Sequence, residues 1–196
     1  AIGLPLDRDD WSQILAELAW ADGFPLEMSR FLCTHLTQPL LVTSLLHHLR
    51  CDTLQWNGHG DQQSITGLYA TVREHGYRIA HTVTGYDHAV IEHLEEMKSW
   101  GSHIDLIVWR SNPLPGETIP LPAVEMVCTA LAATQRPWIM TMDRKKIQSQ
   151  WPRNKNCRGV IVARQSWQQD WGDPALGATN HEHISAWIDI LKRLEC

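Results

Sequence analysis

The sequence of 196 residues lacks any apolar run close to the roughly 20 residues that a membrane-spanning helix requires. Charged residues follow the short apolar start at once, in Asp7–Asp10, so we expect no signal peptide. A CxxC pair is also missing, and the five cysteines are widely spaced. This pattern is typical of reduced, buried thiols, and it predicts a cytoplasmic protein.

Complete short motifs of phosphate, nucleotide or metal chemistry are missing too. The segment Gly58-His59-Gly60 holds two glycines, whereas the dinucleotide fingerprint GxGxxG needs a third. The sequence has no GxSxG nucleophile elbow and no P-loop. Its 11 histidines include no HExxH motif and no Cys₂His₂ pattern. We therefore expect no metal ion and no bound cofactor.

An excess of positive charge is missing as well, because 17 basic and 22 acidic residues give a formal charge of −5. Binding to nucleic acid neutralises many phosphates, so this balance argues against nonspecific binding to DNA or RNA. One stretch differs from the rest, since residues 144–158 hold six basic side chains and no acid. The stretch contains Arg144, Lys145, Lys146, Arg153, Lys155 and Arg158, with Trp151 among them.

We expect residues 144–158 to bind a protein partner with an acidic surface. A phosphorylated ligand, or single-stranded nucleic acid stacked on Trp151, would fit the same charge and aromatic side chain. A solvated basic face without a partner is the plainer alternative.

The first fifty residues carry a helical pattern. Apolar residues between positions 11 and 19 have the spacing of one helix face, and Asp9-Asp10 precede them, where the helix dipole favours acids. Residues 28–36 continue as a helix, and 40–49 form a third one after Pro39. Residues 1–50 are therefore predicted to be a helical extension or cap.

Residues 51–196 alternate between strand and helix five times. Predicted strands cover residues 52–56, 77–83, 104–109, 137–142 and 158–163. Predicted helices cover residues 62–75, 87–100, 123–134, 143–150 and 183–194. Strands that alternate with helices in this way give crossover units and a parallel sheet. The predicted fold class is α/β, with a doubly wound, flavodoxin-like, five-stranded parallel sheet.

The order and lengths of these elements resemble the receiver domain of bacterial response regulators. The resemblance covers about residues 52–196, and three stretches carry it: VREHGYRIAHTVTGYDHAVIEHLEEMKSWGSHIDLIVWR, RPWIMTM and RGVIVAR. It implies a place in two-component signalling. In that family an aspartate after the third strand accepts phosphate, and acids after the first strand hold Mg²⁺.

The positions that carry this chemistry in receivers are occupied by other residue types here. The resemblance places the phosphoacceptor on Arg110, the acidic pair on Asn57 and Gly58, and the conserved lysine on Arg164. Mg²⁺ needs carboxylate oxygens, and a guanidinium cannot accept a phosphoryl group. The resemblance therefore implies a pseudo-receiver, a non-enzymatic regulatory module of a larger bacterial signalling protein that binds a protein partner or forms a homodimer.

The alternative is a ligand-binding α/β domain, possibly an enzyme, whose site lies beyond the carboxyl ends of the strands. The polar residues expected there are His59, Asp61, Arg110 and Arg164. Two arginines and a histidine favour a phosphate or a nucleotide. His59 also resembles the cobalt-binding histidine of cobalamin domains, although the Asp and the Gly of the Asp-x-His-x-x-Gly pattern are missing.

Overall fold

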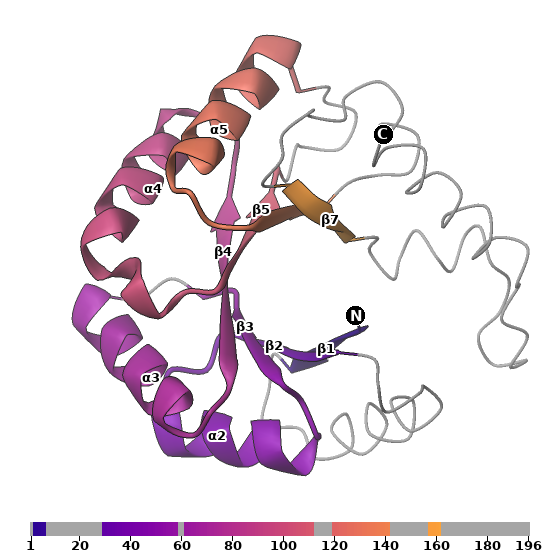
Figure 1. Ribbon diagram of the computed structural model, residues 1–196, viewed down its shortest axis with the longest axis vertical. Helices are drawn as coiled ribbons and strands as arrows, with labels where there is room; N and C mark the ends of the chain where they lie inside the picture. Colours follow the sequence, from indigo (N-terminus) through magenta and orange to yellow (C-terminus); the bar gives the residue numbers. More distant parts are fainter. Residues whose placement is uncertain (1, 7–28, 59–60, 112–118, 142–156, 162–196) are drawn as a thin grey trace, which may run out of the picture. The chain divides into compact units, whose positions relative to one another are not determined.

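The computed structural model describes residues 2–6, 29–58, 61–111, 119–141 and 157–161, and every structural statement below concerns these residues. The strands are β1 (Ile2–Leu6), β2 (Arg30–Thr34), β3 (Thr53–Trp56), β4 (Arg78–Thr84), β5 (Leu106–Arg110), β6 (Trp138–Thr141) and β7 (Cys157–Ile161) (Figure 1). The helices are α2 (Pro39–His48), α3 (Gln62–Glu74), α4 (His88–Trp100), the 3-10 turn η1 (Gly101–His103) and α5 (Leu121–Ala133). The chain divides into two compact units, Ala1–Val83 with His88–Val108, and Thr84–Asp87 with Trp109–Cys196.

Each strand lies beside the strands that precede and follow it along the chain, in the order β1-β2-β3-β4-β5-β6-β7. In the first unit β1, β2, β3 and β4 pair in parallel, and in the second unit β6 and β7 do so. A doubly wound sheet reverses its strand order once, at a topological switch point. The predicted five-stranded doubly wound sheet is therefore wrong, because a strictly sequential order is that of (β/α) barrels.

The predicted helix over residues 28–36 is also wrong, because Arg30–Thr34 form the strand β2. Leu32 and Thr34 are fully buried on one face of this strand, and Cys33 is buried on the other. A strand that is covered on both faces has no alternating pattern, so its apolar residues are easily taken for a helix face. The helix predicted over 40–49 is confirmed by α2, while the one predicted over 11–19 lies outside the described residues.

The two faces of the sheet in the first unit differ in character. The register aligns Cys33 with Gln55, and aligns Trp56 with His81. Because side chains alternate along a strand, these two rows point to opposite faces. Trp56 contacts Tyr69 of α3, and His81 contacts Trp100 of α4. The face that these helices cover is called the outer face below, and the opposite face is called the inner face.

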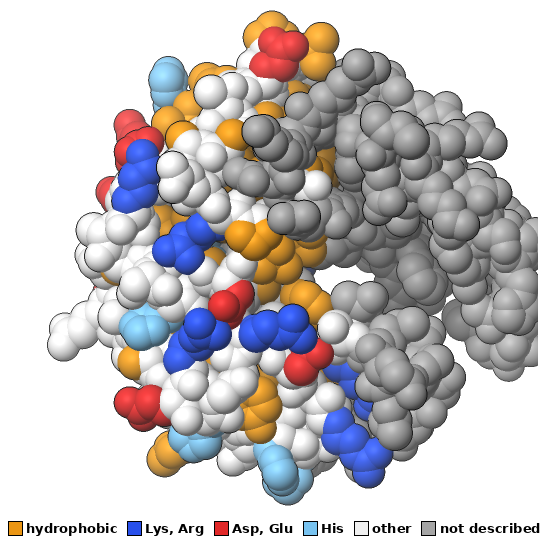
Figure 2. Space-filling view, viewed as in Figure 1, with side chains coloured by type: hydrophobic (Ala, Val, Ile, Leu, Met, Phe, Trp, Pro, Cys, Tyr) orange, Lys and Arg blue, Asp and Glu red, His pale blue; other side chains and the backbone are white. Residues whose placement is uncertain are grey.

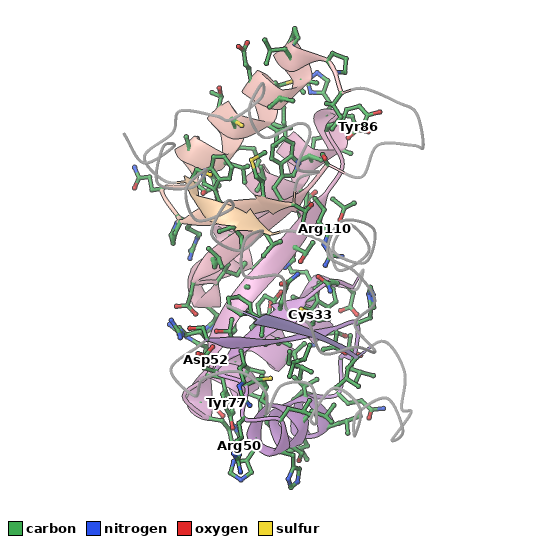
Figure 3. All side chains as sticks on the ribbon, turned by 90° about the vertical axis from the view of Figure 1, so that its right-hand side faces the viewer. Cys33, Arg50, Asp52, Tyr77, Tyr86 and Arg110 are labelled. Atoms are coloured by element: carbon green, nitrogen blue, oxygen red, sulfur yellow. The ribbon has the colours of Figure 1, made fainter. Side chains whose placement is uncertain are left out.

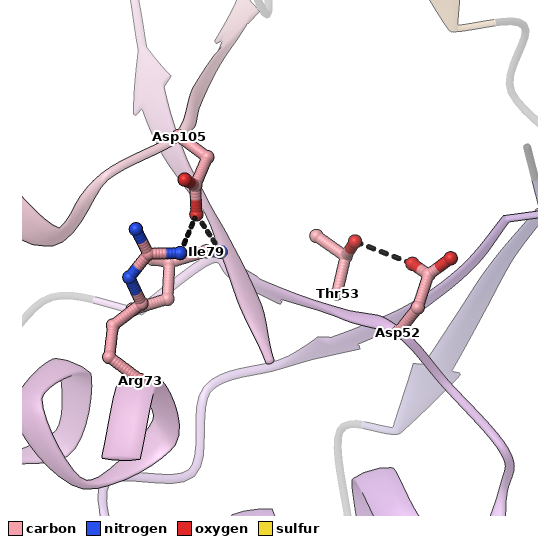
Figure 4. Close-up of polar contacts among 5 residues, drawn as sticks. All are labelled: Asp52, Thr53, Arg73, Ile79 and Asp105. Atoms are coloured by element: carbon pink, nitrogen blue, oxygen red, sulfur yellow. Dashed lines mark hydrogen bonds and ion pairs between the residues drawn. The ribbon is translucent and has the colours of Figure 1, made fainter. Parts of the chain in front are cut away.

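Two acidic side chains tie the elements of the first unit together at the amino ends of its strands (Figure 4). Asp105 Oδ2 accepts hydrogen bonds from the backbone N–H of Ile79, at 2.8 Å, and from Arg73 Nη1, at 3.0 Å. Asp52 Oδ1 accepts one from Thr53 Oγ1 at 2.6 Å. The acids at this edge therefore form structural hydrogen bonds, and a functional site is expected at the opposite edge, where the strands have their carboxyl ends.

Candidate functional site

A chain of hydrogen-bonded polar side chains lies on the inner face of the first unit, toward the carboxyl ends of β2, β3 and β4. It consists of Cys33, Gln55, Asn57 and Thr82, and is called the polar chain below. Cys33 Sγ donates to Gln55 Oε1 at 3.5 Å, and Gln55 Nε2 donates to Thr82 Oγ1 at 3.4 Å. Gln55 and Thr82 are 3% and 8% exposed, so this network is largely shielded from solvent. Figure 3 shows Cys33 on the sheet, with Asp52 and Tyr77 toward the amino ends of the strands.

The polar chain ends at the side-chain amide of Asn57, just after β3. Asn57 Oδ1 accepts from Gln55 Nε2 at 3.1 Å and from Thr82 Oγ1 at 2.6 Å. These two donors fix the orientation of the amide, so its oxygen points into the network and its NH₂ group points away. Within the described part of the chain, no acceptor binds this NH₂ group. Asn57 thus presents a neutral, oriented pair of N–H donors to a ligand oxygen.

The imidazole of His35 lies at the same edge of the sheet, just after β2. His35 and Asn57 each follow by one residue the paired residues Thr34 and Trp56, and the Asn57 backbone N–H donates to the Thr34 carbonyl at 2.9 Å. His35 is exposed. The carboxyl ends of the neighbouring strands β2 and β3 are therefore followed by an imidazole and by an oriented donor.

Trp56 supports this edge from the outer face. A Cβ atom added to Gly58 would lie 2.6 Å from Trp56 Cζ2, so the backbone at Gly58 rests directly on the indole. Trp56 is 1% exposed and stacks on His81, with ring centroids 5.9 Å apart. The indole has little freedom to move, and it fixes where the chain runs as it leaves β3.

Replacing Gly58 with alanine is therefore expected to destabilise the protein by about 1–3 kcal/mol, as overpacking of a rigid site does. The matched control is Gly67→Ala in the middle of α3, where no atom lies within 4 Å of the added Cβ. That change is expected to stabilise the helix by about 0.5–1 kcal/mol, because alanine loses less conformational entropy than glycine. Urea denaturation followed by circular dichroism measures both, and equal effects of the two changes would contradict the contact with Trp56.

Two histidines and a tyrosine form a second hydrogen-bonded chain, on the outer face. Tyr69 Oη lies 2.6 Å from His81 Nδ1, and His81 Nε2 lies 2.9 Å from His93 Nε2. Burial, with a smaller contribution from His93, lowers the pKa of His81 from 6.5 to about 3. Burial also raises the pKa of Tyr69. Sequence patterns did not indicate this cluster, because its members come from β4, α3 and α4 and match no motif.

The four residues predicted to bind a phosphate or a nucleotide are only partly described. Asp61 caps α3 in the first unit, where its carboxylate accepts from the backbone N–H of Ser64 at 2.9 Å and from Ser64 Oγ at 2.6 Å. These hydrogen bonds, led by the one from the Ser64 side chain, lower the pKa of Asp61. Arg110 ends β5 in the second unit, where its carbonyl accepts from the Gly85 N–H at 2.8 Å. His59 and Arg164 lie outside the described residues, so a site made of all four stays a prediction.

The predicted partner surface falls almost entirely outside the described residues. This holds for Arg144, Lys145, Lys146, Trp151, Arg153 and Lys155. The backbone of Arg158 belongs to β7, whereas its side chain is not described. Acidic and basic side chains of the described part are interspersed on the face shown in Figure 2. In this part of the chain no group of three or more histidines, cysteines and acids is placed to hold a metal, and no helix has the length and apolar character to cross a membrane.

Comparison with known proteins decides the fold. No protein-family model matches the sequence, and no curated protein matches it. Among solved structures, phosphoribosyl anthranilate isomerase from Thermus thermophilus aligns over 82% of this chain and 74% of its own, with a TM-score of 0.56 and 13% identity. The isomerase from Thermococcus kodakaraensis aligns over 96% and 86%, with a TM-score of 0.60 and 11% identity. An HpcH/HpaI aldolase/citrate lyase family protein from Burkholderia cenocepacia aligns over 99% and 85%, with a TM-score of 0.58 and 10% identity.

The fold is of the TIM-barrel type. The resemblance to receiver domains is therefore wrong, and so are the pseudo-receiver and the role in two-component signalling inferred from it. The expected non-enzymatic module was inferred from that resemblance and is corrected with it, since the similar solved structures are named as isomerases and as an aldolase/citrate lyase family protein. Receivers and TIM barrels share alternating strands and helices, and they differ in which strands become neighbours.

Proposed function

We propose that this chain is an enzyme that acts on a small, oxygen-rich substrate at the carboxyl ends of β2, β3 and β4. The orientation of the Asn57 amide is the observation that carries the proposal, because two hydrogen bonds hold its NH₂ group away from the protein. In TIM-barrel enzymes the active site lies at this end of the strands. A buried polar network with one donor group left open is the arrangement expected of a substrate-binding site.

The proposed reaction is a proton transfer next to a carbonyl or another developing oxyanion. Asn57 would donate hydrogen bonds to the oxygen that gains charge, and an amide held in place loses no energy to reorientation during the reaction. His35, at the same edge, would give or take the proton. Gln55 and Thr82 would hold Asn57 in position, and the Cys33 thiol would polarise Gln55 from the far end of the network.

The names of the similar structures support an isomerase or a lyase. Phosphoribosyl anthranilate carries a phosphate, a sugar and a carboxylate, and citrate carries three carboxylates. Both compounds are rich in the oxygens that amide donors bind. These two substrate classes are therefore the first to test on this chain.

The test is turnover of phosphoribosyl anthranilate, and of citrate-type hydroxy acids in the lyase direction, by the full-length protein. Asn57→Ala is expected to lower kcat about 100-fold or more with folding retained, as the loss of one oxyanion donor does. His75→Gln is the control for the companion variant His35→Gln, because His75 is an exposed histidine at the opposite edge, after α3. Full activity of Asn57→Ala, or no turnover and no thermal stabilisation by either substrate class, would contradict the proposal.

A further inference from the structure

The outer-face chain of Tyr69, His81 and His93 lies directly behind the proposed site. His81 on β4 contacts aromatic rings from three other elements: Trp56 of β3 at 5.9 Å, Tyr69 of α3 at 6.0 Å, and Trp100 and His93 of α4 at 5.3 and 5.2 Å. It is 1% exposed, while His93 is partly exposed. The buried ring is thus joined to solvent through the second histidine.

The two hydrogen bonds that join Tyr69, His81 and His93 can run in either of two directions. In one, Tyr69 donates to His81 Nδ1 and His81 Nε2–H donates to His93 Nε2. In the other, His93 Nε2–H donates to His81 Nε2 and His81 Nδ1–H donates to Tyr69 Oη. A protonated His93 carries hydrogens on both ring nitrogens, so it permits only the second direction. One proton at His93 therefore reverses both hydrogen bonds, and the buried O–H of Tyr69 then no longer donates to His81 Nδ1.

Trp56 connects the Tyr69–His81–His93 hydrogen bonds to the polar chain. Its indole stacks on His81 on one side, and the backbone of Gly58 packs against it so closely that a Cβ there would lie 2.6 Å away. Asn57 lies between Trp56 and Gly58 in the sequence. Thr82, which donates to Asn57 Oδ1, is the neighbour of His81 on β4. A displacement of the His81 ring is therefore transmitted to Asn57 along both β3 and β4.

We propose that His81 and Trp56 are positioning residues for Asn57, and that the direction of the Tyr69–His81–His93 hydrogen bonds sets the position of the Asn57 amide. This inference rests on the proposed function for the role of Asn57, and it names the regulation of that site. Proton uptake at His93 then changes how the site presents its donor. The effect needs no large movement, because the outer-face side chains are closely packed.

Aromatic side chains from three elements surround the buried ring of His81. From β3 the neighbour of His81 is Trp56, from α3 it is Tyr69, and from α4 it is Trp100 with His93. Tyr69 and His93 are the titratable groups among them, and the charge effect on His81 comes from His93. The acids nearest to His93 along α4 are Glu92, Glu95 and Glu96, and all three are exposed.

The test follows the Asn57 side-chain amide and the Gly58 backbone amide by ¹H–¹⁵N NMR between pH 5 and 8 (about the range in which histidines change charge), on the full-length protein without ligand. Both signals are expected to shift with the same midpoint as the ring protons of His93. In His93→Gln, which keeps a hydrogen-bonding side chain that does not titrate, the shifts are expected to disappear. In His75→Gln, the matched exposed histidine, they are expected to persist.

A second pair of variants separates coupling through Trp56 from a direct effect of charge. In Trp56→Phe, His93 is expected to titrate while the shift of Asn57 becomes smaller, because the route along β3 is weakened and the route through Thr82 on β4 remains. Tyr69→Phe, which keeps the ring, is expected to move the titration midpoints of His93 and Asn57 by the same amount. It replaces His93→Gln in the experiment if that variant does not fold. The inference is overturned if Asn57 does not shift while His93 titrates, or if its shift survives in His93→Gln. The NMR experiment contains no substrate, so the absence of turnover would not change its result. Conversely, a negative NMR result would not decide whether Asn57 takes part in turnover.

Discussion

Replacing Trp56 with alanine is expected to lower the free energy of unfolding by about 3–5 kcal/mol, the range for removal of a large buried aromatic side chain. Trp56 is 1% exposed and contacts the rings of Tyr69 and His81 as well as the backbone of Gly58. Removal of the indole leaves a cavity, and the surrounding side chains cannot move far enough to fill it. Urea denaturation at pH 7, followed by far-ultraviolet circular dichroism, measures the loss.

Two further variants show whether packing causes this loss. Trp56→Phe is expected to cost much less than Trp56→Ala, because it keeps a ring and removes a buried indole N–H that has no hydrogen-bond partner. Leu40→Ala removes a side chain that is 75% exposed, and it is expected to change stability by at most about 0.5 kcal/mol. A loss below about 1.5 kcal/mol in Trp56→Ala would disagree with a closely packed outer face.

Stability is expected to fall as the pH is lowered below 6.5, the ordinary pKa of a histidine, toward the pKa of about 3 that His81 has in the folded protein. Between these values the unfolded chain binds a proton at His81 and the folded chain does not. Acid therefore favours unfolding, at up to about 1.4 kcal/mol per pH unit and about 5 kcal/mol in total. The loss is complete only when the pH reaches the folded-state value. Urea denaturation at half-unit pH steps measures the slope.

The double variant Tyr69→Phe/His81→Phe isolates this contribution. It removes both members of the buried hydrogen bond and keeps two aromatic rings, so no polar group is left unpaired between positions 69 and 81. The difference between the two pH curves therefore reports on His81 together with His93, whose ring loses its hydrogen-bond partner in the variant. Curves that run parallel from pH 6.5 downward would show that the folded-state pKa of His81 is not lowered.

Local structure was largely predictable from the sequence. The helix predicted over 62–75 is α3, and Gly76, predicted to end it, has a positive φ of 82°. The strands predicted over 77–83 and 104–109 correspond to β4 and β5. In these segments the spacing of apolar residues and the capping residues point to the same element. The agreement reflects forces that act over a few residues.

The order of the strands in the sheet could not be predicted from the sequence in the same way. Alternating strands and helices fit a doubly wound sheet and a barrel equally well, because the choice depends on which edge of the sheet each crossover returns to. The missed strand β2 made the error larger. Arg30–Thr34 pairs with both β1 and β3, and without it the N-terminal part looked like a separate helical cap.

The candidate site was missed for a related reason. Gln55 and Thr82 lie within apolar strands and belong to no motif, and their hydrogen bond exists because parallel pairing sets β3 beside β4. Sequence patterns drew attention to charged residues such as Asp61, whose carboxylate proves to cap a helix. Buried polar residues inside a predicted strand are a usable signal, since each of them needs a hydrogen-bond partner.

The alternation of side chains along β3 and β4 has a consequence for how this protein tolerates changes of length. Gln55 and Trp56 are adjacent in the sequence, and so are His81 and Thr82, yet the members of each pair face opposite sides of the sheet. A deletion or insertion of one residue within either strand would exchange the two sides, turning the polar side chains toward the helices and the aromatic rings toward the inner face. Homologues of this protein should therefore vary in length between these strands and keep the strands themselves constant.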